Sequence, residues 1–136
     1  MACNHDGYVI GECVLQHLDE DSFELISGTH LQNWVEYNTV IDDHDVTIER
    51  DLQTSQNPKG AEGRTRTGFG MDGPNAEAIF REVVEGEAPS IPFFNFRRVK
   101  IAGCDVIALR HGMDGHKGGE LSGAYADGPK VRDTRS

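Results

Sequence analysis

The chain has 136 residues, of which 37% are hydrophobic and 26% charged, a size and composition typical of one globular domain or of part of a larger one. Its 13 Lys and Arg against 23 Asp and Glu give a formal net charge of -10. A surface this negative repels phosphate backbones and anionic lipid, which argues against non-specific nucleic-acid or membrane binding. No apolar run has the length that a membrane-spanning helix needs, and the first residues carry no signal-peptide pattern. We therefore expect a cytoplasmic protein.

The acidic residues are spread through the chain instead of being gathered in a tail. Two interpretations stay open. Dispersed carboxylates keep halophilic proteins hydrated in strong salt, and they also occur in ordinary acidic cytosolic proteins. A halophilic chain is expected to lose structure at low ionic strength.

The cysteines predict neither a disulfide framework nor a metal centre. Cys3, Cys13 and Cys104 contain no C-x-x-C pair and are odd in number. Pairing Cys3 with His5, or Cys13 with His17, fits no established zinc spacing, so we expect no metal site. Cys104 lies in an apolar run, where a cysteine behaves as a small buried hydrophobe.

The first half of the chain predicts a hairpin, a helix and a further strand. Apolar and β-branched residues favour a strand within residues 7–18, and the alternation over Phe23–Ile26 predicts its antiparallel partner. Thr29 is expected to cap the helix that follows. Asp45–Arg50 alternates and predicts another strand, whereas residues 52–70 are polar and glycine-rich and predict a mobile loop or insertion.

The second half begins with a helix and continues with strands. Residues 72–75 form a turn signal before a helix that Gly86 is expected to end. Residues 91–96 predict an aromatic extended segment, and residues 98–105 a strand with a tight turn. Val106–Arg110 is uniformly apolar up to its last residue and predicts a buried strand.

The last part of the chain is expected to be irregular. His111–Gly123 is dense in glycine and predicts a loop, and Gly128–Ser136 predicts a frayed polar tail. We expect one partial domain over residues 1–128 and a tail over residues 129–136. Short antiparallel strands with helices on one face predict an α+β fold.

The glycine-dense segment is the strongest candidate for a binding site. Five glycines within residues 110–123 let the backbone approach a flat ligand closely. Within it, the Glu120 carboxylate can accept two parallel N–H bonds from a heterocycle that presents an amino group beside a ring N–H. The alternative is a solvated loop with an incidental acid. His111 and His116 are candidates for a base or a ligand in the same segment.

Several blocks of the sequence occur in the order typical of one protein family. The blocks are Asp6–Glu12, Asp21–Leu25 with Asn33–Val35, Gly73–Ala76, and Pro92–Phe94 with Arg110–Gly112 and Gly119–Leu121. Together they resemble the folate-binding superfamily of the glycine cleavage T-protein (aminomethyltransferase). The resemblance is closest to its tetrahydrofolate-dependent O-demethylase branch, which acts on vanillate- or syringate-type methoxyarenes. It therefore implies a partial aminomethyltransferase folate-binding fold.

The resemblance also implies a cofactor and the residues that bind it. Glu120 falls on the family's acid that binds the pterin ring of tetrahydrofolate, and the same block places Arg110, His111 and Met113 in the cofactor-binding site. Two positions depart from the T-proteins: His30–Gln32 carries no carboxylate where they have an Asp, and Met113 stands where they have a Tyr. Both departures favour the O-demethylase branch over glycine cleavage.

The activity implied is transfer of a methyl or aminomethyl group from a small-molecule donor to tetrahydrofolate, with a general acid that protonates the leaving atom. The sequence does not identify that acid; Tyr8 and His111 are candidates. Family members are much longer, so we expect a fragment, a split-gene product or a degenerate paralogue, with a second polypeptide to supply the missing parts.

Two other functions compete with this enzymatic interpretation. A truncated member of the superfamily would expose apolar surface around Phe93, Phe94 and Phe96 and would act as a non-catalytic interaction module. The other alternative is an acidic globular protein whose similarity to the family is accidental.

Overall fold

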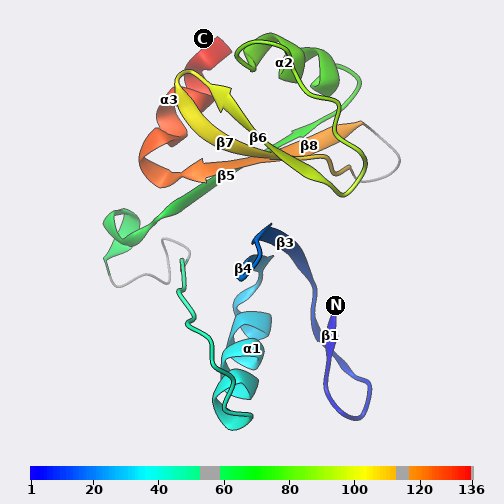
Figure 1. Ribbon diagram of the computed structural model, residues 1–136, viewed down its shortest axis with the longest axis vertical. Helices are drawn as coiled ribbons and strands as arrows, with labels where there is room; N and C mark the ends of the chain where they lie inside the picture. Colours follow the sequence, from blue (N-terminus) through cyan, green and yellow to red (C-terminus); the bar gives the residue numbers. More distant parts are fainter. Residues whose placement is uncertain (53–58, 113–116, 136) are drawn as a thin grey trace. The chain divides into compact units, whose positions relative to one another are not determined.

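A computed structural model describes residues 1–52, 59–112 and 117–135 of the chain (Figure 1). The chain forms two compact units, Met1–Arg50 and Asp51–Ser136. Both contain helices and antiparallel strands, so the fold is α+β, as predicted. Within the described ranges, no helix is both long enough and apolar enough to cross a bilayer.

The first unit consists of two strand pairs and one helix. Its elements are β1 (Ala2–Cys3), β2 (Val9–Gly11), β3 (Cys13–Asp19), β4 (Ser22–Ser27) and α1 (Thr29–Ile41). β3 and β4 form the predicted hairpin, in which Leu15 lies opposite Leu25. A Cβ on Gly11 of β2 would lie 3.1 Å from the Cβ of Leu31, the buried residue of α1. The absence of a side chain at Gly11 therefore lets β2 and α1 approach each other closely.

Three predictions for this unit need correction. The strand expected within residues 7–18 is interrupted at Glu12, between β2 and β3. The N-cap of α1 is Gly28 and not Thr29, which is the first helical residue. The strand predicted over Asp45–Arg50 has no regular secondary structure, because an alternating pattern forms a strand only where a partner pairs with it.

The second unit is built on a four-stranded antiparallel sheet with the strand order β5–β8–β7–β6 (Figure 1). Its strands are β5 (Arg66–Asp72), β6 (Phe96–Ile101), β7 (Cys104–Leu109) and β8 (Gly118–Ala124). Its helices are α2 (Ala76–Val83) and α3 (Gly128–Arg132), with short 3-10 helices at η1 (Gly60–Gly63), η2 (Tyr125–Asp127) and η3 (Asp133–Arg135). β8 thus lies between β5 and β7, and both of its edges are paired.

One face of this sheet carries the hydrophobic core. Its buried residues are Val84, Ile91, Val99, Ile101, Val106, Ala108 and Leu121. Phe80 and Val83 of α2 and Val131 of α3 pack against them, so the helices cover one face of the sheet, as predicted. The predicted helix after residues 72–75 is confirmed as α2, although it ends at Val83, before Gly86.

The glycine-rich parts of this unit were predicted wrongly. The end of the loop expected over residues 52–70 is part of strand β5, and the loop expected over His111–Gly123 contains most of β8, one of the two inner strands of the sheet. Residues 128–135 are not a frayed tail, since they begin with α3, whose Val131 contacts the core. In each case tertiary pairing or packing outweighs the low local propensity. The grouping of residues 1–128 into one partial domain stays a prediction.

Candidate functional site

Glu120 lies in the middle of the sheet, on strand β8. Its Cα partners are Gly70 on β5 and Leu109 on β7. Residues directly opposite each other in a ladder project from the same face, and successive residues of a strand alternate between faces. Glu120 therefore projects away from the core face, which carries its neighbour Leu121. Glu120 is half-buried and is held by a paired strand, and not by the loop that we expected.

Two glycines leave one side of this carboxylate free of side chains. Gly68 and Gly70 on β5 lie on the same face as Glu120, and we call them the glycine strip. A Cβ at Gly70 would meet no atom within 4 Å, and a Cβ at Gly68 would meet only the carbonyl oxygen of Leu121, at 3.8 Å. A ligand beside Glu120 can therefore approach the backbone of β5 directly.

A buried hydroxyl group lies next to Glu120 on the same face. Ser122 is two residues further along β8, with Ile107 and Gly68 as its cross-strand partners. Its Oγ is buried, and among the described residues it has no hydrogen-bond partner. Buried polar atoms in proteins are almost always hydrogen-bonded, so a free hydroxyl at this position needs an explanation. Sequence reasoning missed Ser122, because its relation to Glu120 is visible only once residues 118–124 are known to be a strand.

Arg110, which directly follows β7, is hydrogen-bonded to the segment that leads from α2 to β6. Its Nη1 donates a hydrogen bond to the carbonyl oxygen of Ile91 at 3.0 Å. Its backbone N–H donates a hydrogen bond to the carbonyl oxygen of Asn95 at 2.9 Å. These bonds fix the position at which β7 ends. They show a structural role for the guanidinium, beside which its expected role in cofactor binding stays a prediction.

His111 packs against an aromatic side chain. Its ring meets Phe94 edge to face, with 5.2 Å between the ring centroids, and its Nδ1 is buried without a hydrogen-bond partner in the part of the chain that the structure describes. Phe94 has a φ of 56°, in the left-handed region that a bulky residue rarely adopts. The predicted site residue Met113, and also His116, lie outside the described residues.

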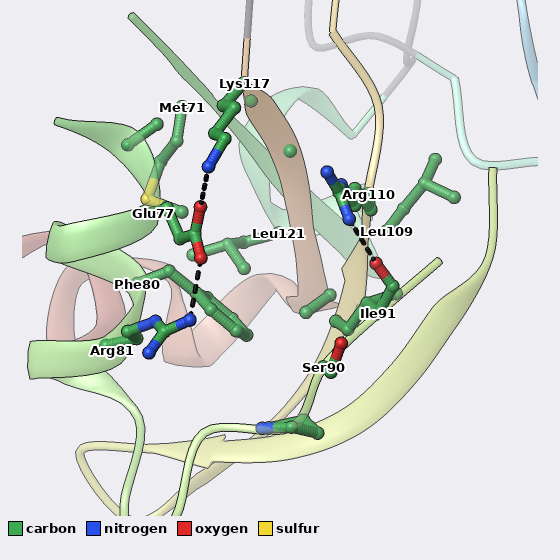
Figure 2. A pocket seen from close by; sticks show the side chains of 15 residues that line it. Met71, Glu77, Phe80, Arg81, Ser90, Ile91, Leu109, Arg110, Lys117 and Leu121 are labelled. Atoms are coloured by element: carbon green, nitrogen blue, oxygen red, sulfur yellow. Dashed lines mark hydrogen bonds and ion pairs between the residues drawn. The ribbon is translucent and has the colours of Figure 1, made fainter. Parts of the chain in front are cut away.

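A second feature of this unit is a hollow on the core face, shown in Figure 2. It has a volume of about 100 Å³ and lies between α2, residues 89–91 and the strands β7 and β8. Its lining includes Phe80, Leu121 and Arg110, whereas Glu120 is not among its described lining residues. The hollow and the Glu120 carboxylate therefore lie on opposite faces of β8.

Charged side chains close one side of the hollow. Glu77 on α2 accepts a hydrogen bond from Lys117 Nζ at one carboxylate oxygen and from Arg81 Nη2 at the other, both at 2.7 Å (Figure 2). The bond from Lys117, followed by that from Arg81, lowers the pKa of Glu77. Sequence reasoning could have found Glu77 and Arg81 from their helical i, i+4 spacing. It could not have found Lys117, which is 40 residues away from Glu77 along the chain.

The remaining candidates from the sequence are exposed or half-buried. Tyr8, proposed as a general acid, is 72% exposed and lies in the first unit. Phe93 and Phe94 are 58% and 56% exposed, and their rings meet edge to face with 5.0 Å between centroids. Phe96 is half-buried at the start of β6.

Comparison with known proteins agrees with the fold and with the predicted family. Residues 1–134 match the model of the GCVT N-terminal domain. The chain is 38% identical over 122 residues to a syringate O-demethylase of Sphingobium sp., an alignment that covers 90% of this chain and 26% of that protein. It is 27% identical over 135 residues to an aminomethyltransferase of Thermotoga petrophila, and this alignment covers 96% of this chain and 34% of that protein.

These alignments cover nearly all of this chain but only part of each relative. The chain spans about a quarter to a third of the length of these two relatives, so it corresponds to part of each of them. The family match, by contrast, covers nearly all of the chain, in agreement with the resemblance to the T-protein and O-demethylase group. The chain belongs to the GCVT N-terminal domain family.

Proposed function

We propose that this chain supplies the pterin-binding strand of a tetrahydrofolate-dependent, O-demethylase-like one-carbon transferase. The observation that carries the proposal is the position of half-buried Glu120 on an inner strand, beside the open glycine strip. The names of the relatives, a syringate O-demethylase and an aminomethyltransferase, support transfer of a one-carbon group.

The residues on this face fit the pterin ring of tetrahydrofolate. An ionised carboxylate can accept two parallel hydrogen bonds, and the edge of a pterin offers an amino group beside a ring N–H. The hydroxyl of Ser122 is a further unpartnered polar group on the face, among the described residues. When bound, tetrahydrofolate would supply the N5 nitrogen that accepts the one-carbon group.

The contribution of the chain itself is binding and orientation. Because β8 is paired on both sides, the backbone of Glu120 is fixed, and the carboxylate can hold a ring at a defined angle. Fixed orientation of two reactants lowers the barrier of a transfer step without any covalent participation of the protein. The small-molecule methyl donor and the general acid would be held by parts that correspond to the rest of the relatives, either in the same polypeptide or in a second one.

Titration with tetrahydrofolate under anaerobic conditions tests the proposal. The parent chain should bind, and Glu120→Ala and Glu120→Gln should bind more weakly by roughly tenfold to a hundredfold, since a hydrogen bond to a charged group contributes about 1.5–3 kcal/mol. Glu87→Gln, which changes an exposed glutamate in the segment after α2, is the matched control and should bind like the parent. Equal affinity of Glu120→Ala and the parent would refute the role of Glu120.

A non-catalytic interaction module is a second candidate function, favoured by the exposed pair Phe93 and Phe94. Apolar side chains exposed side by side often mark a docking surface. Size-exclusion chromatography with light scattering separates the two functions. A monomer that binds tetrahydrofolate supports the enzymatic proposal, whereas an obligate oligomer without affinity for tetrahydrofolate supports the module.

A further inference from the structure

We infer that Ser122 and the glycine strip form the second half of the heterocycle site. The Ser122 hydroxyl, once rotation about χ1 has turned it out of its buried position, would hydrogen-bond the edge of the ring system, and the face of the ring system would lie on the backbone at Gly68 and Gly70. This inference rests on the proposed function and extends it, because it names residues for the ligand beyond the glutamate that the family resemblance implies.

The spacing of the two polar groups suits a flat ligand with two fused rings. Glu120 and Ser122 are separated by one residue of β8, so their side chains leave the same face about 7 Å apart along the strand. A single ring bound at Glu120 would end before it reached Ser122. A two-ring heterocycle that donates to the carboxylate through one ring extends far enough to meet the hydroxyl with the other.

The state of the Ser122 hydroxyl also indicates a ligand. Its Oγ is buried and unpartnered among the described residues, although a buried hydroxyl without a hydrogen bond destabilises a folded chain. An alanine at this position would remove that cost. A serine there is readily explained if the hydroxyl finds its partner when a ligand binds.

The residues of β5 also indicate a ligand on the Glu120 face, because the two faces of this strand differ in composition. On the core face, the strand carries Thr67, Phe69 and Met71, which are ordinary strand residues. On the Glu120 face it carries the glycine strip, although glycine weakens a strand. A Cβ would fit at Gly70 without contact, so neighbouring atoms do not require glycine there. Close approach of a ligand to the backbone does explain it.

Two substitutions in the full chain test this inference, with tetrahydrofolate as the probe. Ser122→Ala should weaken binding about three- to tenfold, which is the range for one neutral hydrogen bond. It should also leave the thermal midpoint of the ligand-free chain unchanged or raise it. Gly70→Val should fill the open space beside Glu120 and weaken binding at least tenfold, with an unchanged far-UV circular dichroism spectrum.

Gly28→Val is the matched control. A Cβ at Gly28 also meets no atom within 4 Å, its φ of -69° accepts any side chain, and it lies in the first unit, before α1. This variant should bind tetrahydrofolate like the parent. Loss of binding in Gly28→Val equal to that in Gly70→Val would show that the loss does not arise at the glycine strip and would overturn the inference.

The outcomes separate this inference from the proposed function. If Glu120→Ala loses affinity while Ser122→Ala and Gly70→Val bind like the parent, the proposed function stands and the inference is wrong. If Ser122→Ala lowers the thermal midpoint of the ligand-free chain, its hydroxyl has a structural partner and the inference is also wrong. If the parent does not bind tetrahydrofolate at all, the proposed function of the chain fails, and the inference with it.

Discussion

The substitution Gly119→Ala tests how closely β8 packs against β7. A Cβ at this position would lie 2.9 Å from the carbonyl oxygen of Leu109, closer than real Cβ atoms come to other atoms. The oxygen belongs to a paired strand, so the two strands must move apart. Overpacking of this kind costs about 1–3 kcal/mol, whereas replacing a strand glycine by alanine returns about 0.5–1 kcal/mol. We expect Gly119→Ala to lower the free energy of unfolding by about 0.5–2 kcal/mol.

Gly70→Ala is the counterpart on β5, and it should have the opposite sign. A Cβ at Gly70 meets nothing within 4 Å, so only the gain of about 0.5–1 kcal/mol from the loss of glycine remains. Both variants are compared with the parent by urea unfolding, with hydrogen exchange at the β7 amides of Val106 and Ala108 as the reporter. Fluorescence of Trp34 is unsuitable, because this residue lies in the first unit. A Gly119→Ala chain as stable as the parent would refute the packing calculation.

Two further predictions concern ionisable groups. Lys117 and Arg81 hold the pKa of Glu77 below its ordinary value of 4.5, so its contribution to stability is complete above that value and is lost as the pH falls through the lower pKa of the folded chain. Glu77→Gln should therefore melt below the parent at pH 7, with the difference closing in acid; equal midpoints at pH 7 would contradict this. Burial is the main cause that raises the pKa of the Cys104 thiol, so a thiol reagent should modify exposed Cys3 first and Cys104 last. Urea should abolish this order, and equal rates in the native chain would show that Cys104 is accessible.

The elements that the sequence predicted well have signals that do not depend on a partner. α2 follows a turn at Gly73 and Pro74 and presents its apolar residues at helical spacing. β7 ends in the apolar run Val106–Leu109, which predicts a buried strand, and Gly103 supplies the positive φ of 75° that the turn before it needs. The local sequence is therefore sufficient to predict both α2 and β7.

The elements that were missed depend on contacts far away in the sequence. β5 and β8 contain so many glycines that they read as loops, yet each pairs with the other along its whole length. A period-two signal was present in Thr67, Phe69 and Met71, but glycine at the alternate positions concealed it. Asp45–Arg50 shows the reverse error, because its alternation is clear and no strand pairs with it among the described residues.

The candidate site was predictable in part for the same reason. Glu120 could be named from the carboxylate chemistry and from the family resemblance, both of which are local in the sequence. The face on which it projects could not be named, because that depends on the register of β8 against Gly70 and Leu109. Ser122 and the glycine strip follow from that register alone.

The double pairing of β8 has a consequence for affinity. A carboxylate on a loop must lose backbone and side-chain freedom when it captures a ligand, and this loss subtracts from the binding free energy. At Glu120 the backbone has already been immobilised during folding, so only the rotamers of one side chain remain to be restricted. Evolution or design can therefore adjust the recognition of a heterocycle here through single side chains, without rebuilding the scaffold beneath them.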